Sequence, residues 1–136
     1  MKELEVRADG SELSTVITFV DEQIEAVGCS PKTLMQIELS VEEIFVNIAN
    51  YAYAPGTGSA IIRLDISGDP PTAEITFVDK GRQYDPLAKE DPDVTLPAKD
   101  RGIGGLGIFL TKKSMDEVSY VYRDGSNVFT MKKVLV

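Results

Sequence analysis

One predicted helix carries polar side chains whose types and spacing could support chemistry. Glu43, Asn47 and Asn50 recur at steps of three or four residues within the segment 39–53, so on a helix they lie on one face. A carboxylate can orient or deprotonate a hydroxyl nucleophile, and a neutral amide oxygen suits magnesium that bridges phosphates. A face that is simply in contact with solvent is the alternative interpretation of the same pattern.

A second polar position comes directly after a predicted strand. Asp79 ends the strand, and Gly81 follows it after one residue. An aspartate in this position can accept a hydrogen bond from an exocyclic amine such as that of adenine, and the glycine would let a flat ring approach the backbone. A turn built from aspartate and glycine is the alternative, because both residues are common in turns.

A third candidate is a glycine-rich segment that leads into a predicted helix. Gly104, Gly105 and Gly107 would expose backbone N–H groups to an anion, and the helix dipole would favour negative charge there. Arg101 adds a fixed positive charge for phosphate oxygens. The segment lacks the Lys-Ser/Thr pair of a P-loop, and a flexible hinge is the alternative interpretation.

The hydrophobic pattern predicts the elements that position these residues. Alternating apolar residues indicate strands, and apolar residues at three- and four-residue steps indicate helices. Serine at a helix cap, proline in a first turn and Asp-Gly between strands give the boundaries. The expected order is a strand at 4–6, a helix from Ser11 to about Gly28, a helix from Ser30-Pro31 to about Tyr53, strands at 60–66 and 73–77, an aperiodic segment at 86–104, a helix at 106–114, and strands at 118–122 and 128–134.

This order predicts an α+β fold formed by a single domain over residues 1–136. Consecutive strands joined by short turns form antiparallel hairpins, and the helices must cover one face of the resulting sheet. We therefore expect a two-layer α/β sandwich with a mainly antiparallel mixed sheet and the helices on one face.

The composition excludes several classes of function. The chain has 136 residues, 43% of them hydrophobic, and a formal net charge of −8, which argues against a nucleic-acid surface and would suit a basic protein partner. Cys29 is the one cysteine, so no internal disulfide forms and a reducing compartment is expected. The charged start and the lack of a membrane-length apolar run predict a cytoplasmic protein without a membrane contact. The sequence has no histidine, which removes imidazole catalysis and an internal phosphohistidine.

Taken in order, the three motifs resemble those of the Bergerat ATP-binding fold, the superfamily of histidine-kinase, gyrase and chaperone ATPase domains. Two longer runs, 79–86 and 104–120, are similar to the stand-alone anti-sigma-factor serine/threonine kinases of bacteria, and the likeness extends from the first helix to the C-terminus. The motifs are Glu43-x-x-x-Asn47 on a helix, Asp79-x-Gly81 after a strand and Gly105-x-Gly107 before a helix.

The resemblance implies a role for each candidate residue. Glu43 would be the base that prepares a serine hydroxyl, and Asn47 would coordinate Mg²⁺ held by the ATP phosphates, with Asn50 beside it in the cofactor site. Asp79 would bind the adenine amine. The remaining positions implied are Gly81 for the space beside the ring, Gly104, Gly105 and Gly107 for closure over the phosphates, and Arg101 for the terminal phosphoryl group.

The function implied is that of an ATP-dependent anti-sigma regulator. Such a protein binds a sigma factor and phosphorylates a serine on an anti-anti-sigma (STAS-type) antagonist, and it is commonly a homodimer. Two positions depart from the family pattern: Tyr51 stands where histidine is usual, and Gln83 where a second glycine is common. These departures keep open a non-catalytic module that binds nucleotide and only sequesters a partner. A histidine-kinase ATPase domain with a separate acceptor protein is the other alternative.

Overall fold

The computed structural model of the chain describes residues 1–88 and 106–136. Arg101, Gly104 and Gly105 lie outside the described residues, as does most of the segment predicted to be aperiodic. The described elements are β1 (Lys2–Arg7), α1 (Leu13–Val27), α2 (Pro31–Asn47), β2 (Ser59–Ser67), β3 (Thr72–Asp79), α3 (Leu106–Ser114), β4 (Glu117–Arg123) and β5 (Ser126–Val134), with 3-10 turns at Gly10–Glu12 and Pro86–Ala88 and a π-helical turn at Ile48–Ala52.

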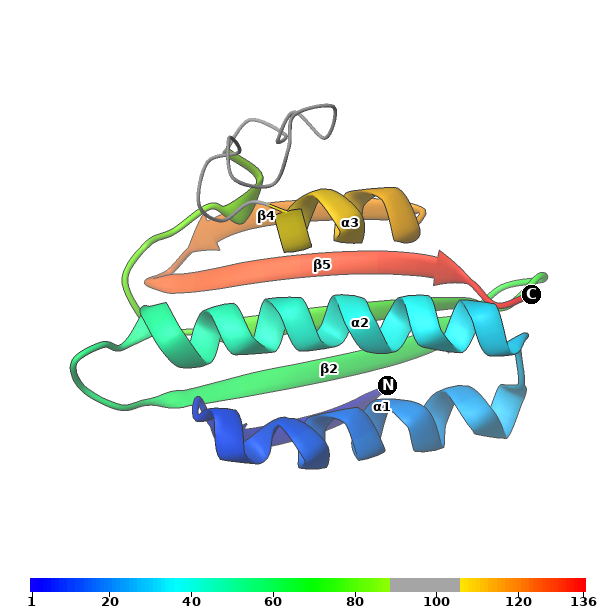
Figure 1. Cartoon of the computed structure of the whole chain (residues 1–136), viewed down its shortest axis with the longest axis horizontal. Helices are drawn as coiled ribbons and strands as arrows, with labels where there is room; N and C mark the ends of the chain where they lie inside the picture. Colours follow the sequence, from blue (N-terminus) through cyan, green and yellow to red (C-terminus); the bar gives the residue numbers. More distant parts are fainter. Residues whose placement is uncertain (89–105) are drawn as a thin grey trace.

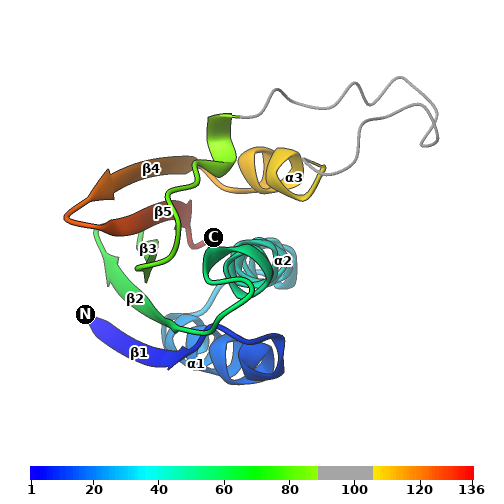
Figure 2. The same cartoon turned by 90° about the vertical axis from the view of Figure 1, so that its left-hand side faces the viewer.

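The strands form one sheet in the order β1-β2-β3-β5-β4. Every pairing between the described strands is antiparallel, so the predicted α+β sandwich with a mainly antiparallel sheet is confirmed, and no parallel pair occurs among the described strands. The three helices lie on one face of the sheet, with α2 between α1 and α3 (Figures 1 and 2). No helix in the described part of the chain combines the length and the apolar character needed to cross a bilayer.

The core lies between this sheet face and the helices because alternate strand residues point toward α1 and α2. Phe45 on α2 and Phe77 on β3 are among its largest fully buried side chains. The other buried hydrophobic residues of the central elements are Ile37, Val41, Ile44, Ala60, Ile62, Leu64, Ala73, Ile75, Phe129 and Met131.

Side-chain caps mark the starts of the first two helical segments, and the prediction of the cap was right for α2 and wrong for the first helix. Ser30 accepts a hydrogen bond from Thr33 N at 3.2 Å, and Pro31 occupies the first turn of α2, as predicted. At the first helix, Ser11 is not the cap. Asp9 accepts from the backbone N–H of Ser11 at 3.0 Å and begins the 3-10 turn that leads into α1.

The turn between β4 and β5 sets the register that brings one side of the site together. Asp124 and Gly125 have φ angles of 53° and 77°, the left-handed pair that a tight two-residue hairpin requires. In the resulting register Tyr122 pairs with Asn127 on β5, and Asn127 in turn pairs with Asp79 on β3.

Candidate functional site

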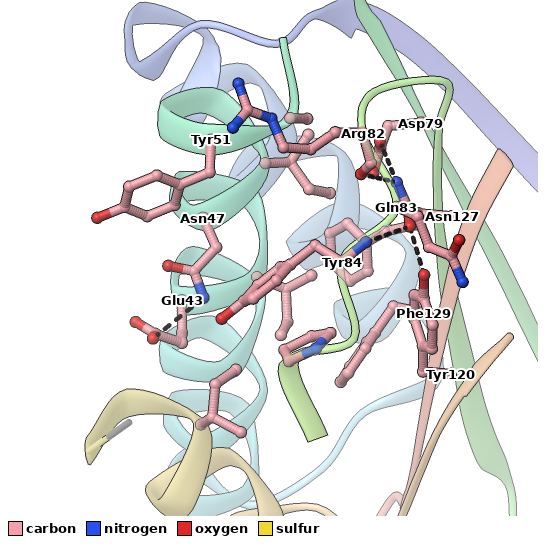
Figure 3. Close-up of a pocket in the computed structure, with 16 residues that line it drawn as sticks. Glu43, Asn47, Tyr51, Asp79, Arg82, Gln83, Tyr84, Tyr120, Asn127 and Phe129 are labelled. Carbon is pink, nitrogen blue, oxygen red and sulfur yellow. Dashed lines mark hydrogen bonds between the residues drawn. The ribbon is translucent and has the colours of Figure 1, made fainter. Parts of the chain in front are cut away.

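A pocket of about 450 Å³ opens between the C-terminal part of α2 and the strand ends of β3, β4 and β5 (Figure 3). Its volume falls in the range of small-molecule sites. Apolar walls surround a few polar groups, as is typical of such sites. The pocket is lined by Glu43, Ile44, Asn47, Ile48, Tyr51, Ala52, Phe77, Asp79, Arg82, Gln83, Tyr84, Pro86, Ile108, Tyr120, Asn127 and Phe129.

Glu43 and Asn47 form the helical wall of this pocket, as the sequence predicted. Asn47 Nδ2 donates a hydrogen bond to Glu43 Oε1 at 3.4 Å, so the amide nitrogen faces the carboxylate. Among the described residues no donor binds Asn47 Oδ1. The amide oxygen is therefore a neutral ligand that a hard cation could use. The described part of the chain holds no cluster of three or more Cys, Asp or Glu side chains able to bind a metal by themselves.

Asn50 is exposed and does not line the pocket, so its place in the cofactor site stays a prediction. The reason that it does not line the pocket is the π-helical turn at Ile48–Ala52. Its i→i+5 hydrogen bonding widens the helix, so the residue that follows Asn47 on the pocket face is Tyr51 rather than Asn50. Tyr51 lines the pocket while 59% of its surface remains exposed.

Asp79 lies on the opposite wall, at the end of β3, and is 5% exposed. Its Oδ1 accepts hydrogen bonds from Gly81 N and from Asn127 Nδ2, each at 2.9 Å. No donor in residues 1–88 and 106–136 binds its Oδ2. A buried carboxylate with one oxygen committed to the protein can offer the other to an N–H donor of a ligand.

Gly81 has a packing role that differs from the predicted one. A Cβ at this position would lie 2.2 Å from Ala52 O, so it would point at the π-helical turn, and Gly81 does not line the pocket. Arg82 continues the contact, with its backbone N–H donating to Ala52 O at 2.9 Å and its Nη2 donating to Ala54 O at 2.6 Å. The close packing of Gly81 against Ala52, together with these two hydrogen bonds, therefore holds the turn after β3 against the C-terminal end of the helix that carries Asn47.

Gly107 is the one glycine of the predicted glycine-rich motif that the structure describes, and it is the second residue of α3. It does not line the pocket itself, but a Cβ on it would lie 2.1 Å from Cδ of Glu43. Glu43 and Gly107 also line a smaller cavity of about 290 Å³ between α2 and α3. The first turn of α3 thus packs closely against the Glu43 carboxylate. The dipole at this N-terminal end of α3 favours negative charge.

Sequence reasoning missed Asn127, which is 6% exposed. Its Oδ1 accepts from Tyr84 N at 3.1 Å and from the Tyr120 hydroxyl, while its Nδ2 donates to Asp79 Oδ1 and, at 2.8 Å, to Arg82 O. Burial raises the pKa of Tyr120, so this hydroxyl keeps its proton and donates it. Next to Asp124-Gly125 an asparagine resembles an ordinary turn residue, and only the strand register shows that it faces Asp79.

Comparisons with known proteins place this geometry among nucleotide-dependent domains. The family model of the histidine kinase-like ATPase domain matches residues 6–133. The serine/threonine-protein kinase BtrW of Bordetella bronchiseptica is 29% identical over 102 residues, which cover 75% of this chain and 71% of that protein.

A solved structure shows the same fold. It contains the RsbU and RsbW domains of a Mycobacterium tuberculosis protein and superposes with a TM-score of 0.67 at 15% sequence identity. The match covers 99% of this chain and 33% of that one, so this chain spans about a third of it. The likeness confirms the predicted two-layer arrangement of helices and sheet.

Proposed function

The chain belongs to the family of histidine kinase-like ATPase domains, and we propose that it is an ATP-binding serine/threonine protein kinase that regulates a sigma factor. In this proposal it acts in the cytoplasm, binds the sigma factor, and transfers phosphate to a serine on an anti-anti-sigma protein of the STAS type. The relative from Bordetella bronchiseptica carries the name of a serine/threonine kinase, and the solved neighbour includes an RsbW domain. Both names support this direction.

The observation that carries the proposal is that Glu43, Asn47 and Asp79 line one cavity. Asp79 lies on the sheet side with Phe77 and Phe129 nearby, which suits a flat base with an exocyclic amine. Glu43 and Asn47 lie on the helix side (Figure 3), which suits the phosphates and their cation. A nucleotide would therefore lie across the pocket, from β3 to α2.

The chemistry proposed for the helix side is phosphoryl transfer. Such transfer requires positioning and charge neutralisation more than covalent catalysis. Asn47 Oδ1 would hold Mg²⁺, which supplies positive charge to the phosphate oxygens. Glu43 would accept the proton of the attacking serine hydroxyl, and its hydrogen bond from Asn47 keeps the carboxylate beside the phosphates.

A second candidate function is a nucleotide-binding module that sequesters a partner without transferring phosphate. Tyr51 and Gln83 both line the pocket, and these are the positions at which the chain departs from the family pattern. These two departures from the family pattern, inside the pocket where a nucleotide would bind, are what favour this alternative. The second rival, a domain that phosphorylates a histidine on a separate protein, uses the same pocket and differs in the acceptor.

A transfer assay distinguishes these functions. The purified chain is incubated with Mg²⁺, γ-labelled ATP and a STAS-type protein that carries the acceptor serine. We expect label on serine, and we expect Glu43→Ala to abolish transfer while the Kd for ATP changes little. ATP binding without transfer would support the sequestering module, and acid-labile label on a partner histidine would support the second rival. A serine-to-alanine variant of the acceptor is the matched control.

A further inference from the structure

Asn127 is the centre of a buried hydrogen-bond network that reaches from β4 to Asp79 (Figure 3). All four hydrogen-bonding positions of its amide are used, two by acceptors on Asp79 and Arg82 and two by donors on Tyr84 and Tyr120. Buried networks of this kind are rigid when every member is paired. The turn after β3 is therefore fixed by a side chain from the last strand of the fold.

The partners of Asn127 allow one orientation of its amide. The backbone N–H of Tyr84 can only donate, so the amide oxygen of Asn127 must face it. A flipped amide would point its N–H₂ group at this N–H and its oxygen at the acceptors on Asp79 and Arg82, so three of its four hydrogen bonds would be lost. The Tyr120 hydroxyl donates a second hydrogen bond to the amide oxygen and supports the same orientation.

The two carboxylate oxygens of Asp79 therefore differ in their hydrogen bonds. Oδ1 receives Gly81 N and Asn127 Nδ2, while in the described part of the chain Oδ2 receives no hydrogen bond. A carboxylate held in this way presents one acceptor oxygen in one direction. It would accept from a 6-amino purine, whereas a 6-oxo purine would place its carbonyl oxygen, a second acceptor, against the carboxylate.

We propose that Asn127 is a positioning residue that sets the selectivity of the pocket for 6-amino over 6-oxo purine nucleotides, with the backbone N–H of Tyr84 and the hydroxyl of Tyr120 holding its amide oxygen. This inference rests on the proposed function, because it assumes that the base lies beside Asp79. Asn127 acts through Asp79 and needs no contact of its own with the nucleotide. A residue that merely stabilised the fold would weaken the binding of every nucleotide alike. A positioning residue would instead change the ratio of the Kd values for the two kinds of purine nucleotide.

The test is the ratio of the Kd values for inosine triphosphate and ATP, measured by calorimetry in the wild-type chain, Asn127→Ala and Tyr120→Phe. We expect the wild type to prefer ATP and Asn127→Ala to lower the preference about tenfold, the effect of losing a hydrogen bond to a charged group. Tyr120→Phe keeps the donor on Tyr84, so we expect a smaller decrease in the same direction. Thr18→Ala, at an exposed position on α1 that does not line the pocket, is the control and should leave the ratio unchanged.

Two results would overturn the inference. If Asn127→Ala and Tyr120→Phe leave the ratio unchanged, or weaken both nucleotides equally, Asn127 has a structural role alone while the proposed function stands. If the wild-type chain binds neither nucleotide, the proposed function fails and this inference fails with it. Thermal unfolding of each variant shows whether it is folded, and if Asn127→Ala is not, Tyr120→Phe alone decides the outcome.

Discussion

Glu43 and Gly107 are in such close contact that a Cβ atom on residue 107 would lie 2.1 Å from Cδ of the glutamate. The contact joins the C-terminal part of α2 to the first turn of α3, two elements separated by residues 48–105, which include the part outside the described residues. The carboxylate proposed to accept the serine proton is therefore positioned by α3 as well as by its own helix. Glycine at 107 has a steric reason in addition to any role in phosphate binding.

Gly107→Ala should lower both the rate of phosphate transfer and the stability of the fold. The added methyl group has no room, so either Glu43 changes rotamer or α3 moves away from α2, and we expect transfer to fall by about tenfold or more, because about 1.4 kcal/mol in a barrier is a factor of ten. Over-packing of this kind also destabilises a fold by about 1–3 kcal/mol. Transfer assays and urea unfolding measure the two effects.

Gly10→Ala is the matched control for this substitution, because a Cβ on Gly10 meets no atom within 4 Å. It should leave transfer and stability close to wild type. Wild-type transfer rates in Gly107→Ala would contradict the assignment of Glu43, since a displaced base cannot accept the proton at the same rate.

Gly81→Ala should destabilise the fold. A Cβ at 81 would lie 2.2 Å from Ala52 O, the carbonyl that accepts from Arg82 N. The turn after β3 would have to move away from the helix and lose this hydrogen bond, which predicts a loss of about 1–3 kcal/mol in the free energy of unfolding. Urea unfolding compared with Gly10→Ala measures it, and equal stability of the two variants would contradict the close packing.

Asp21 on α1 makes stability depend on pH. Its Oδ1 is buried without a hydrogen-bond donor in the described residues. The pKa of Asp21 is raised to about 7, first by burial, then by a shared hydrogen bond with Glu38 and by the negative charges of Glu38 and Glu25. From its ordinary value of 3.8 up to about 7 the folded chain binds more protons than the unfolded chain, so stability decreases as pH rises through this window and is level above it.

Asp21→Asn should remove this effect, because the amide is neutral at every pH and can donate to Glu38. We expect the variant to be more stable than wild type at pH 8 by on the order of 1 kcal/mol, after allowance for partial exposure. The gap should close toward pH 4. Urea unfolding at both pH values measures it, with the exposed Glu22→Gln as the control on the same helix. A gap that widens toward low pH would contradict the assigned pKa.

The sequence was sufficient to predict the elements and much of the helical wall of the site. Period-two and helical patterns gave all five strands and three α-helices, because each element buries one face against the same core. Glu43 and Asn47 were found because a four-residue step on a regular helix fixes their relative direction. The place of Asn50 was predicted on the assumption that this regularity continued, whereas residues 48–52 form a π-helical turn and Asn50 does not line the pocket.

The residues that escaped prediction act through long-range contacts. Asn127 reaches Asp79 through strand pairing across 48 residues of sequence, and no local pattern encodes that register. Gly81 was expected to leave space for the base, and Gly107 to allow closure over the phosphates. The structure adds that their missing Cβ atoms make room for Ala52 and Glu43, contacts that depend on how distant elements pack.

Binding of ATP is the central claim, and one calorimetric titration of the wild-type chain with ATP, in the presence and absence of Mg²⁺, tests it most directly. We predict saturable binding at submillimolar ATP that Mg²⁺ strengthens, with the strengthening lost in Asn47→Ala because the amide oxygen would hold the cation. Absence of binding at millimolar ATP with Mg²⁺ present would contradict the account.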